Sequence, residues 1–160
     1  MVHRFPWQQW FGHGGEALPV LAIIGVIALV LLVSLAIHIA ICWFLSSCFA
    51  RIPVAYRRQD PAMVWLLLVP CFNLVWAFFV LPRLSESFQA YFEAQGRTDV
   101  GDCGRTLAML YCIGGVVVSV VGWVPFVGLL NCLVGPLLLV VLILFLVTAA
   151  ALKGQIPPGA

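Results

Sequence analysis

Long stretches without a charged side chain dominate the sequence and are separated by short polar segments. Residues 17–50, 61–81 and 106–152 contain no Asp, Glu, Lys or Arg. A helix of about 20 apolar residues crosses the ~30 Å hydrocarbon core of a bilayer. The pattern therefore predicts an all-α integral membrane protein with four transmembrane helices, which we expect at about 18–48, 61–81, 106–122 and 129–152.

The outer apolar stretches differ from a single span in length. As one helix, residues 17–50 would reach about 50 Å, so this helix must tilt, protrude or end early. Residues 106–152 suit two spans, with a break near 123–128 because Pro and Gly interrupt helices there. The four spans then form two hairpins within one transmembrane domain, residues 17–152.

An amphipathic segment separates the two expected hairpins. Residues 84–95 place large apolar side chains at helical spacing and polar ones on the remaining circumference. Beside a bilayer, such a helix is expected to lie in the interface. Its anchors are Phe88, Tyr91 and Phe92, and the aromatic head of residues 1–16 supplies Trp7 and Trp10. Residues 153–160 form a short tail.

Composition supports the bilayer as the solvent of this chain. Of its 160 residues, 64% are hydrophobic and 9% charged, whereas a soluble domain carries about 25% charged residues. The mean hydropathy is +1.13. The formal net charge of +2 and the absence of a basic run predict no nucleic-acid partner. The six cysteines show neither zinc-ligand spacing nor a disulfide framework.

The distribution of basic residues bears on orientation. In a four-span chain both termini lie on one side, together with the segment 82–105, and that side would carry Arg4, Arg83, Arg97, Arg105 and Lys153. The other side would carry three basic residues, in the segment 51–58. The excess favours termini inside, although the density of arginine in segment 51–58 argues the other way.

Few side chains at membrane depth could carry chemistry. His38 is the only His, Asp, Glu, Lys or Arg within an expected span, which disfavours ion-coupled pumps and carriers. No phosphate loop, Ser-His-Asp arrangement or His-Glu-x-x-His motif occurs. We therefore expect no enzymatic activity, no catalytic or metal-binding residue, and no required cofactor.

Four residues within the expected spans are polar or can kink a helix, namely His38, Pro70, Asn73 and Asn131. His38 could ligate a haem or a chlorophyll magnesium, but a hydrogen bond to a neighbouring helix, or a position near the interface, is the favoured explanation of one histidine without a second ligand. Pro70 is expected to kink the second span, and Asn73 follows it by one turn. Asn73 and Asn131 could bind across to other helices or line a polar path.

One face of the third expected span consists of small residues. Ala108, Cys112, Gly115, Ser119 and Gly122 recur at alternating spacings of four and three residues. Small residues let helix backbones approach closely in lipid, where no hydrophobic drive brings helices together. This face is expected to meet another helix, within the chain or from a partner.

The second expected span and the segment after it resemble a known group. The run Trp65-Leu-Leu-Leu-Val-Pro70-Cys-Phe-Asn73-Leu-Val-Trp76 and the turn Gly101-Asp-Cys-Gly104 resemble those of uncharacterised bacterial four-span membrane proteins. The resemblance covers about residues 51–152. It supports the shared architecture only and carries no activity. For the location we expect a bacterial inner (cytoplasmic) or intracytoplasmic membrane.

Three functions remain compatible with these features. The favoured one is a structural or accessory protein, a small subunit that packs against other membrane-protein subunits in a larger complex. The first alternative is a cofactor- or pigment-binding subunit of a photosynthetic or respiratory complex, with His38 as the ligand. The second is a small-solute channel or carrier whose path Asn73, Ser119 and Asn131 would line.

Overall fold

A computed structural model describes the backbone of residues 14–121 and 128–157. The side chains of residues 14–19, 70–71, 121 and 128–133 lie outside this description. The expectation of an all-α chain is confirmed, since the described residues form five helices and no strand. Two of these helices are long and apolar enough to cross a membrane, at Val20–Arg51 and Val134–Gly154.

The chain divides into two units, residues 1–40 and residues 41–160. The first helix, α2 (Gly14–Arg51), contributes to both units. Within the first unit, every described side chain from Val20 to Ala40 is exposed. Apart from Ser34 and His38, these exposed side chains are apolar or glycine around the whole helix, as expected for a helix that lipid or another membrane helix surrounds.

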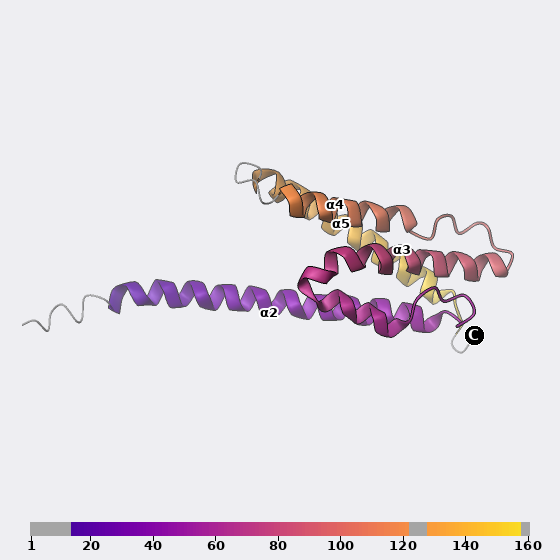
Figure 1. Cartoon of the computed structure of the whole chain (residues 1–160), viewed down its shortest axis with the longest axis horizontal. Helices are drawn as coiled ribbons and strands as arrows, with labels where there is room; N and C mark the ends of the chain where they lie inside the picture. Colours follow the sequence, from indigo (N-terminus) through magenta and orange to yellow (C-terminus); the bar gives the residue numbers. More distant parts are fainter. Residues whose placement is uncertain (1–13, 122–127, 158–160) are drawn as a thin grey trace, which may run out of the picture. The chain divides into compact units, whose positions relative to one another are not determined.

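In the second unit, the stretch expected to form one spanning helix folds as a helical hairpin. A 3-10 helix, η1 (Pro61–Leu68), is followed by the long helix α3 (Pro70–Ala94), which runs back alongside it (Figure 1). The Trp76 indole Nε1 donates a hydrogen bond to the Met63 carbonyl at 2.8 Å and ties the two arms together. The expectation of one continuous helix over 61–81 is therefore wrong.

The turn of this hairpin follows from the chemistry of proline. Val69 has extended backbone angles, φ −80° and ψ 113°, because the ring of a following proline disfavours the helical conformation. Pro70 then occupies the first turn of α3, where its missing N–H leaves no hydrogen bond unmade. Pro70 thus separates two helices. The predicted kink within a single helix is wrong.

The helix α3 continues past Pro82 to Ala94 and includes the segment expected to lie in the interface. Its apolar side chains Leu84, Phe88, Tyr91 and Phe92 are at most 4% exposed. The Tyr56 ring packs edge-on against Tyr91 at 5.9 Å between centroids. An amphipathic pattern shows that one face leaves water, and here other parts of the chain cover that face. Residues 84–94 are therefore part of α3, with their apolar face in the protein core, and do not form the separate interfacial helix that the sequence predicted.

The last two helices form the second hairpin. α4 (Arg105–Val121) and α5 (Gly128–Gly154) end and begin on either side of the expected break, and residues 122–127 lie outside the described residues. A Cβ added at Gly114 of α4 would collide with the Leu138 side chain of α5. The Leu138 side chain of α5 thus packs directly against the α4 backbone at Gly114.

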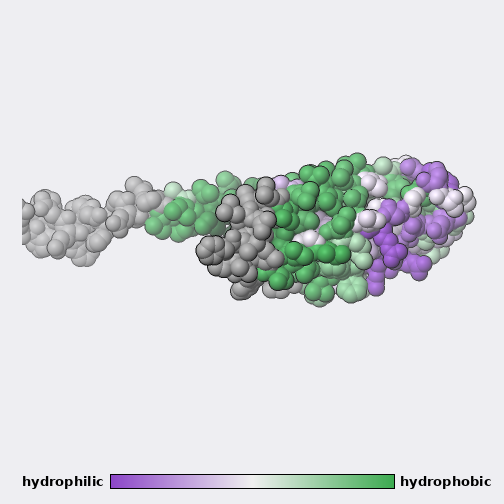
Figure 2. Space-filling view, turned by 90° about the horizontal axis from the view of Figure 1, so that it is seen from above, coloured by the Kyte–Doolittle hydropathy of each residue, from purple (hydrophilic) through white to green (hydrophobic). Residues whose placement is uncertain are grey.

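Polar contacts gather the charged segments at one end of the second unit, where Figure 2 shows hydrophilic side chains beside an apolar surface. We call residues 51–60, 95–105 and 153–157 the polar end. Arg51 Nε donates to the Ile156 carbonyl at 3.4 Å. Lys153 Nζ lies 2.7 Å from Ser47 Oγ, and Arg97 Nη1 lies 2.8 Å from Gln155 Oε1. The two groups of basic residues expected on opposite sides therefore lie together.

Candidate functional site

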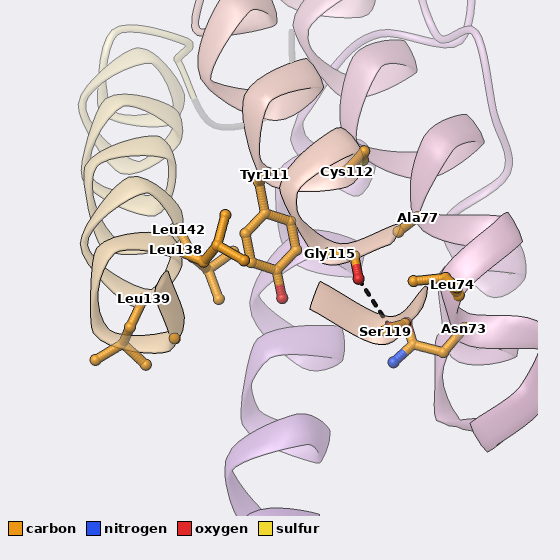
Figure 3. A pocket seen from close by; sticks show the side chains of 11 residues that line it. Asn73, Leu74, Ala77, Tyr111, Cys112, Gly115, Ser119, Leu138, Leu139 and Leu142 are labelled. Carbon is orange, nitrogen blue, oxygen red and sulfur yellow. Dashed lines mark hydrogen bonds between the residues drawn. The ribbon is translucent and has the colours of Figure 1, made fainter. Parts of the chain in front are cut away.

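A cavity with a volume of about 500 Å³ lies between α3, α4 and α5 (Figure 3). Cavities of about 300–1,000 Å³ are typical of sites for small molecules. It is lined by Asn73, Leu74 and Ala77 of α3, by Tyr111, Cys112, Gly115 and Ser119 of α4, and by Gly135, Leu138, Leu139 and Leu142 of α5.

Three neutral polar side chains face this cavity. Asn73 begins the wall from the first turns of α3, while Tyr111 and Ser119 come from α4. In Figure 3 the Tyr111 ring stands between the α5 leucines and α3. The Ser119 hydroxyl donates to the Gly115 carbonyl at 2.8 Å. Its proton is therefore in use, and its lone pairs remain as acceptors. The set combines amide and hydroxyl donors and acceptors without a formal charge.

The remaining lining is apolar and closely packed. Leu138, Leu139 and Leu142 form the α5 wall (Figure 3), and Leu139 is 59% exposed at the rim. Gly115 lies opposite Leu74 of α3, where an added Cβ would make an ordinary contact at 3.8 Å. The absence of a side chain at Gly115 enlarges the cavity, but the contact between α3 and α4 does not require a glycine there.

The small-residue face of α4 meets another helix of the same chain along part of its length. Ala108 is fully buried and Cys112 is buried, and Gly115 lies nearest to Leu74 of α3. Ser119 is exposed at the cavity. Gly122 lies outside the described residues. The face thus serves packing within the chain near the polar end and lines the cavity farther along.

The other residues singled out in the sequence are spread over the molecule. His38 belongs to the first unit, and its side chain is exposed on α2. Asn131 lies in α5, but its side chain lies outside the described residues, as do Trp7 and Trp10. Among the described residues, no group of three His, Cys, Asp or Glu side chains could hold a metal ion.

The Gly-Asp-x-Gly turn organises the start of α4. Gly101, Cys103 and Gly104 have φ values of 64°, 48° and 82°, a region that glycine enters at little cost. Asp102 uses its two carboxylate oxygens to accept from the Gly104 and Thr106 backbone N–H groups at 3.1 and 2.9 Å. A hydrogen bond from the Thr106 side chain, together with those from the Thr106 and Gly104 backbone N–H groups, lowers the pKa of Asp102. The motif is therefore a helix cap at the polar end.

Polar side chains are also buried near the polar end. Gln59 is 6% exposed, and neither its amide oxygen nor its amide nitrogen has a hydrogen-bond partner among the described residues. Ser85 is fully buried, and its hydroxyl is likewise unpartnered there. Such groups cost stability unless water satisfies them, so we expect ordered water beside them.

Sequence reasoning missed Tyr111, Gly114 and Leu138. Tyr111 reads as an ordinary aromatic in an apolar run, and the contact between Gly114 and Leu138 joins different helices. For Gly114 the local signal of close approach is its pairing with Gly115, because Gly114 lies outside the small-residue face. Which helix each glycine meets depends on the fold.

Comparison with known proteins adds no assignment. No family model matches the chain, and no curated protein or solved structure is significantly similar to it. The class supported by the fold is therefore that of an all-α protein with two helices long and apolar enough to cross a membrane.

Proposed function

We propose that this chain is a non-enzymatic accessory protein of a bacterial membrane, which uses α2 to pack against other membrane-protein subunits. The observation that carries the proposal is the exposure of α2. From Val20 to Ala40 it buries no described side chain within its own chain. A helix that only anchored the protein would need about 20 residues, and α2 has 38.

We further propose three membrane crossings in place of four. α2, α4 and α5 cross, while the hairpin of η1 and α3 enters the bilayer from the polar end and returns to it. The support is the gathering of Arg51, Arg97 and Lys153 through contacts with Ile156, Gln155 and Ser47. Irregular backbone at membrane depth is tolerated where protein covers it. Basic residues favour the cytoplasmic side, which places the polar end inside and the N-terminus outside.

Photo-crosslinking along α2 tests the accessory role. A photoreactive amino acid is placed singly at each position from Leu29 to Leu35 of the full chain in native membranes. If α2 packs against a subunit, protein adducts of one mass form from positions on one helical face. The matched control is Leu45, a leucine of the same helix that is 1% exposed, and it is expected to form no such adduct.

A different pattern would overturn the proposal. Lipid adducts of equal yield at every position from Leu29 to Leu35 would show that α2 is surrounded by lipid alone. Protein adducts of equal yield from Leu31 and from the buried Leu45 would show that the labelling does not report a specific surface.

A further inference from the structure

We propose that the cavity between α3, α4 and α5 binds an uncharged, membrane-soluble molecule that has a hydrogen-bond-accepting head and an apolar tail. This inference uses the membrane placement proposed above, and it does not depend on a partner subunit.

The lining determines the charge of the ligand. None of the eleven lining residues carries a formal charge. A charged head buried here in a hydrocarbon environment would have no compensating partner, and such burial is costly. An anionic phospholipid or a metal ion is therefore disfavoured, and a neutral molecule fits.

The polar side chains determine the kind of head. Tyr111 brings a hydroxyl donor and Asn73 an amide donor to the same cavity. The Ser119 proton is already donated to the Gly115 carbonyl. The Tyr111 hydroxyl thus offers a donor from α4, and a carbonyl oxygen can accept from it. Asn73, which already takes part in an interaction of its own, adds a polar amide from α3. Quinone-type and glyceride-type heads share this chemistry.

The apolar wall determines the rest of the molecule. Leu138, Leu139 and Leu142 form one side of the cavity (Figure 3). Leu139 is 59% exposed, so the cavity opens past it to the surroundings of the second unit. In a bilayer those surroundings are acyl chains. A tail leaving past Leu139 would stay in hydrocarbon, whereas a molecule that is polar throughout would not.

Binding of three probes that share a ten-carbon tail tests the proposal. The full-length protein in lipid nanodiscs is titrated with a decyl-substituted benzoquinone, with decylbenzene and with decyl sulfate, and empty nanodiscs correct for partition. Saturable binding of the quinone alone is expected. Dioctanoylglycerol is a further arm, and its competition with the quinone shows that a glyceride carbonyl is also accepted. Saturable binding of decylbenzene or decyl sulfate with equal affinity would overturn the proposal.

Variants of two lining residues test whether the probe binds in this cavity. Tyr111→Phe removes one hydroxyl and keeps the ring, so we expect binding to weaken about 2- to 10-fold, the loss of one neutral hydrogen bond. Asn73→Leu is expected to weaken it similarly. Tyr56→Phe, at the polar end, is the matched control and should bind like the parent. Unchanged affinity in both Tyr111→Phe and Asn73→Leu would overturn the proposal, whatever α2 crosslinks to.

Discussion

At the residue scale, two adjacent glycines of α4 have different surroundings. A Cβ at Gly114 would collide with Leu138 of α5, whereas a Cβ at Gly115 would meet Leu74 of α3 at 3.8 Å. In lipid, the closeness of backbones contributes much of the attraction between helices. Gly114 therefore makes room for the Leu138 side chain against α4, and Gly115 leaves room in the cavity.

The two glycines give a matched prediction for stability. Alanine at either position gains the same helix propensity, about 1 kcal/mol, so their difference isolates the contact. We expect Gly114→Ala to be less stable than Gly115→Ala by about 1–2 kcal/mol, since overpacking strains the neighbouring helix. Thermal unfolding in mild detergent measures it. Equal stabilities would show that Leu138 moves aside without cost.

At the element scale, the start of α4 depends on one carboxylate outside the helix. Asp102 accepts from the backbone N–H groups of Gly104 and Thr106, and Arg105 forms an ion pair with Glu86 of α3 at 3.4 Å. The first N–H groups of a helix lack partners within it, and the positive end of the helix dipole favours a negative charge. The turn at 101–104 thus both starts α4 and holds it beside α3.

This cap predicts a dependence of stability on pH. Because the pKa of Asp102 is lower in the folded protein, its ionised form contributes stability above the ordinary aspartate pKa of about 3.9. That contribution is lost as the pH falls through the lowered folded value. Asp102→Asn keeps an oxygen acceptor but not the charge. We expect the parent to unfold at a higher temperature than Asp102→Asn at pH 7, and the difference to shrink below pH ~4; charges at helix ends contribute about 0.3–1 kcal/mol. A difference independent of pH would contradict this role.

At the scale of the whole molecule, the gathering of the charged segments supports the proposed three membrane crossings in place of four. Segment 51–58 and segment 82–105 would lie on opposite sides in a four-span protein. The structure brings them to the same end of the second unit, where the Arg58 backbone N–H donates to Ser87 Oγ at 3.0 Å. Contacts between residues this far apart in sequence are incompatible with a bilayer between them.

Labelling from one side of the membrane tests this placement. Single cysteines are introduced as Ala55→Cys and Thr98→Cys, both at exposed positions, and sealed vesicles are treated with a membrane-impermeant maleimide. We expect both variants to react in vesicles of one orientation and neither in the other. The parent chain is the control, because its described cysteines Cys42, Cys48, Cys103 and Cys112 are buried. Reaction of the two variants from opposite sides would restore the four-span arrangement.

Local patterns in the sequence predicted most helical residues and several helix ends. Long apolar runs favour helices in lipid because only a helix satisfies its own backbone hydrogen bonds there. α3 ends at Ala94, before Gly96 with φ 72°, and α4 begins directly after the Gly-Asp-x-Gly turn. The cavity was only partly foreseen: Asn73 and Ser119 were singled out, whereas Tyr111 lies in an apolar run without a local signal.

By itself, the sequence determined that the chain is helical and apolar enough for a membrane, because hydropathy and helix propensity are properties of neighbouring residues. Only the tertiary structure decided what covers each apolar face. An amphipathic pattern is the same whether lipid or protein covers the apolar face. Phe88 and Phe92 were therefore predicted to lie in the membrane interface, although they lie in the protein core. The fold also decided that residues 61–81 turn back at Val69. Pro70 supplies the local break, but the return of α3 alongside η1 is held by contacts such as Trp76 with Met63, which the local pattern does not reveal.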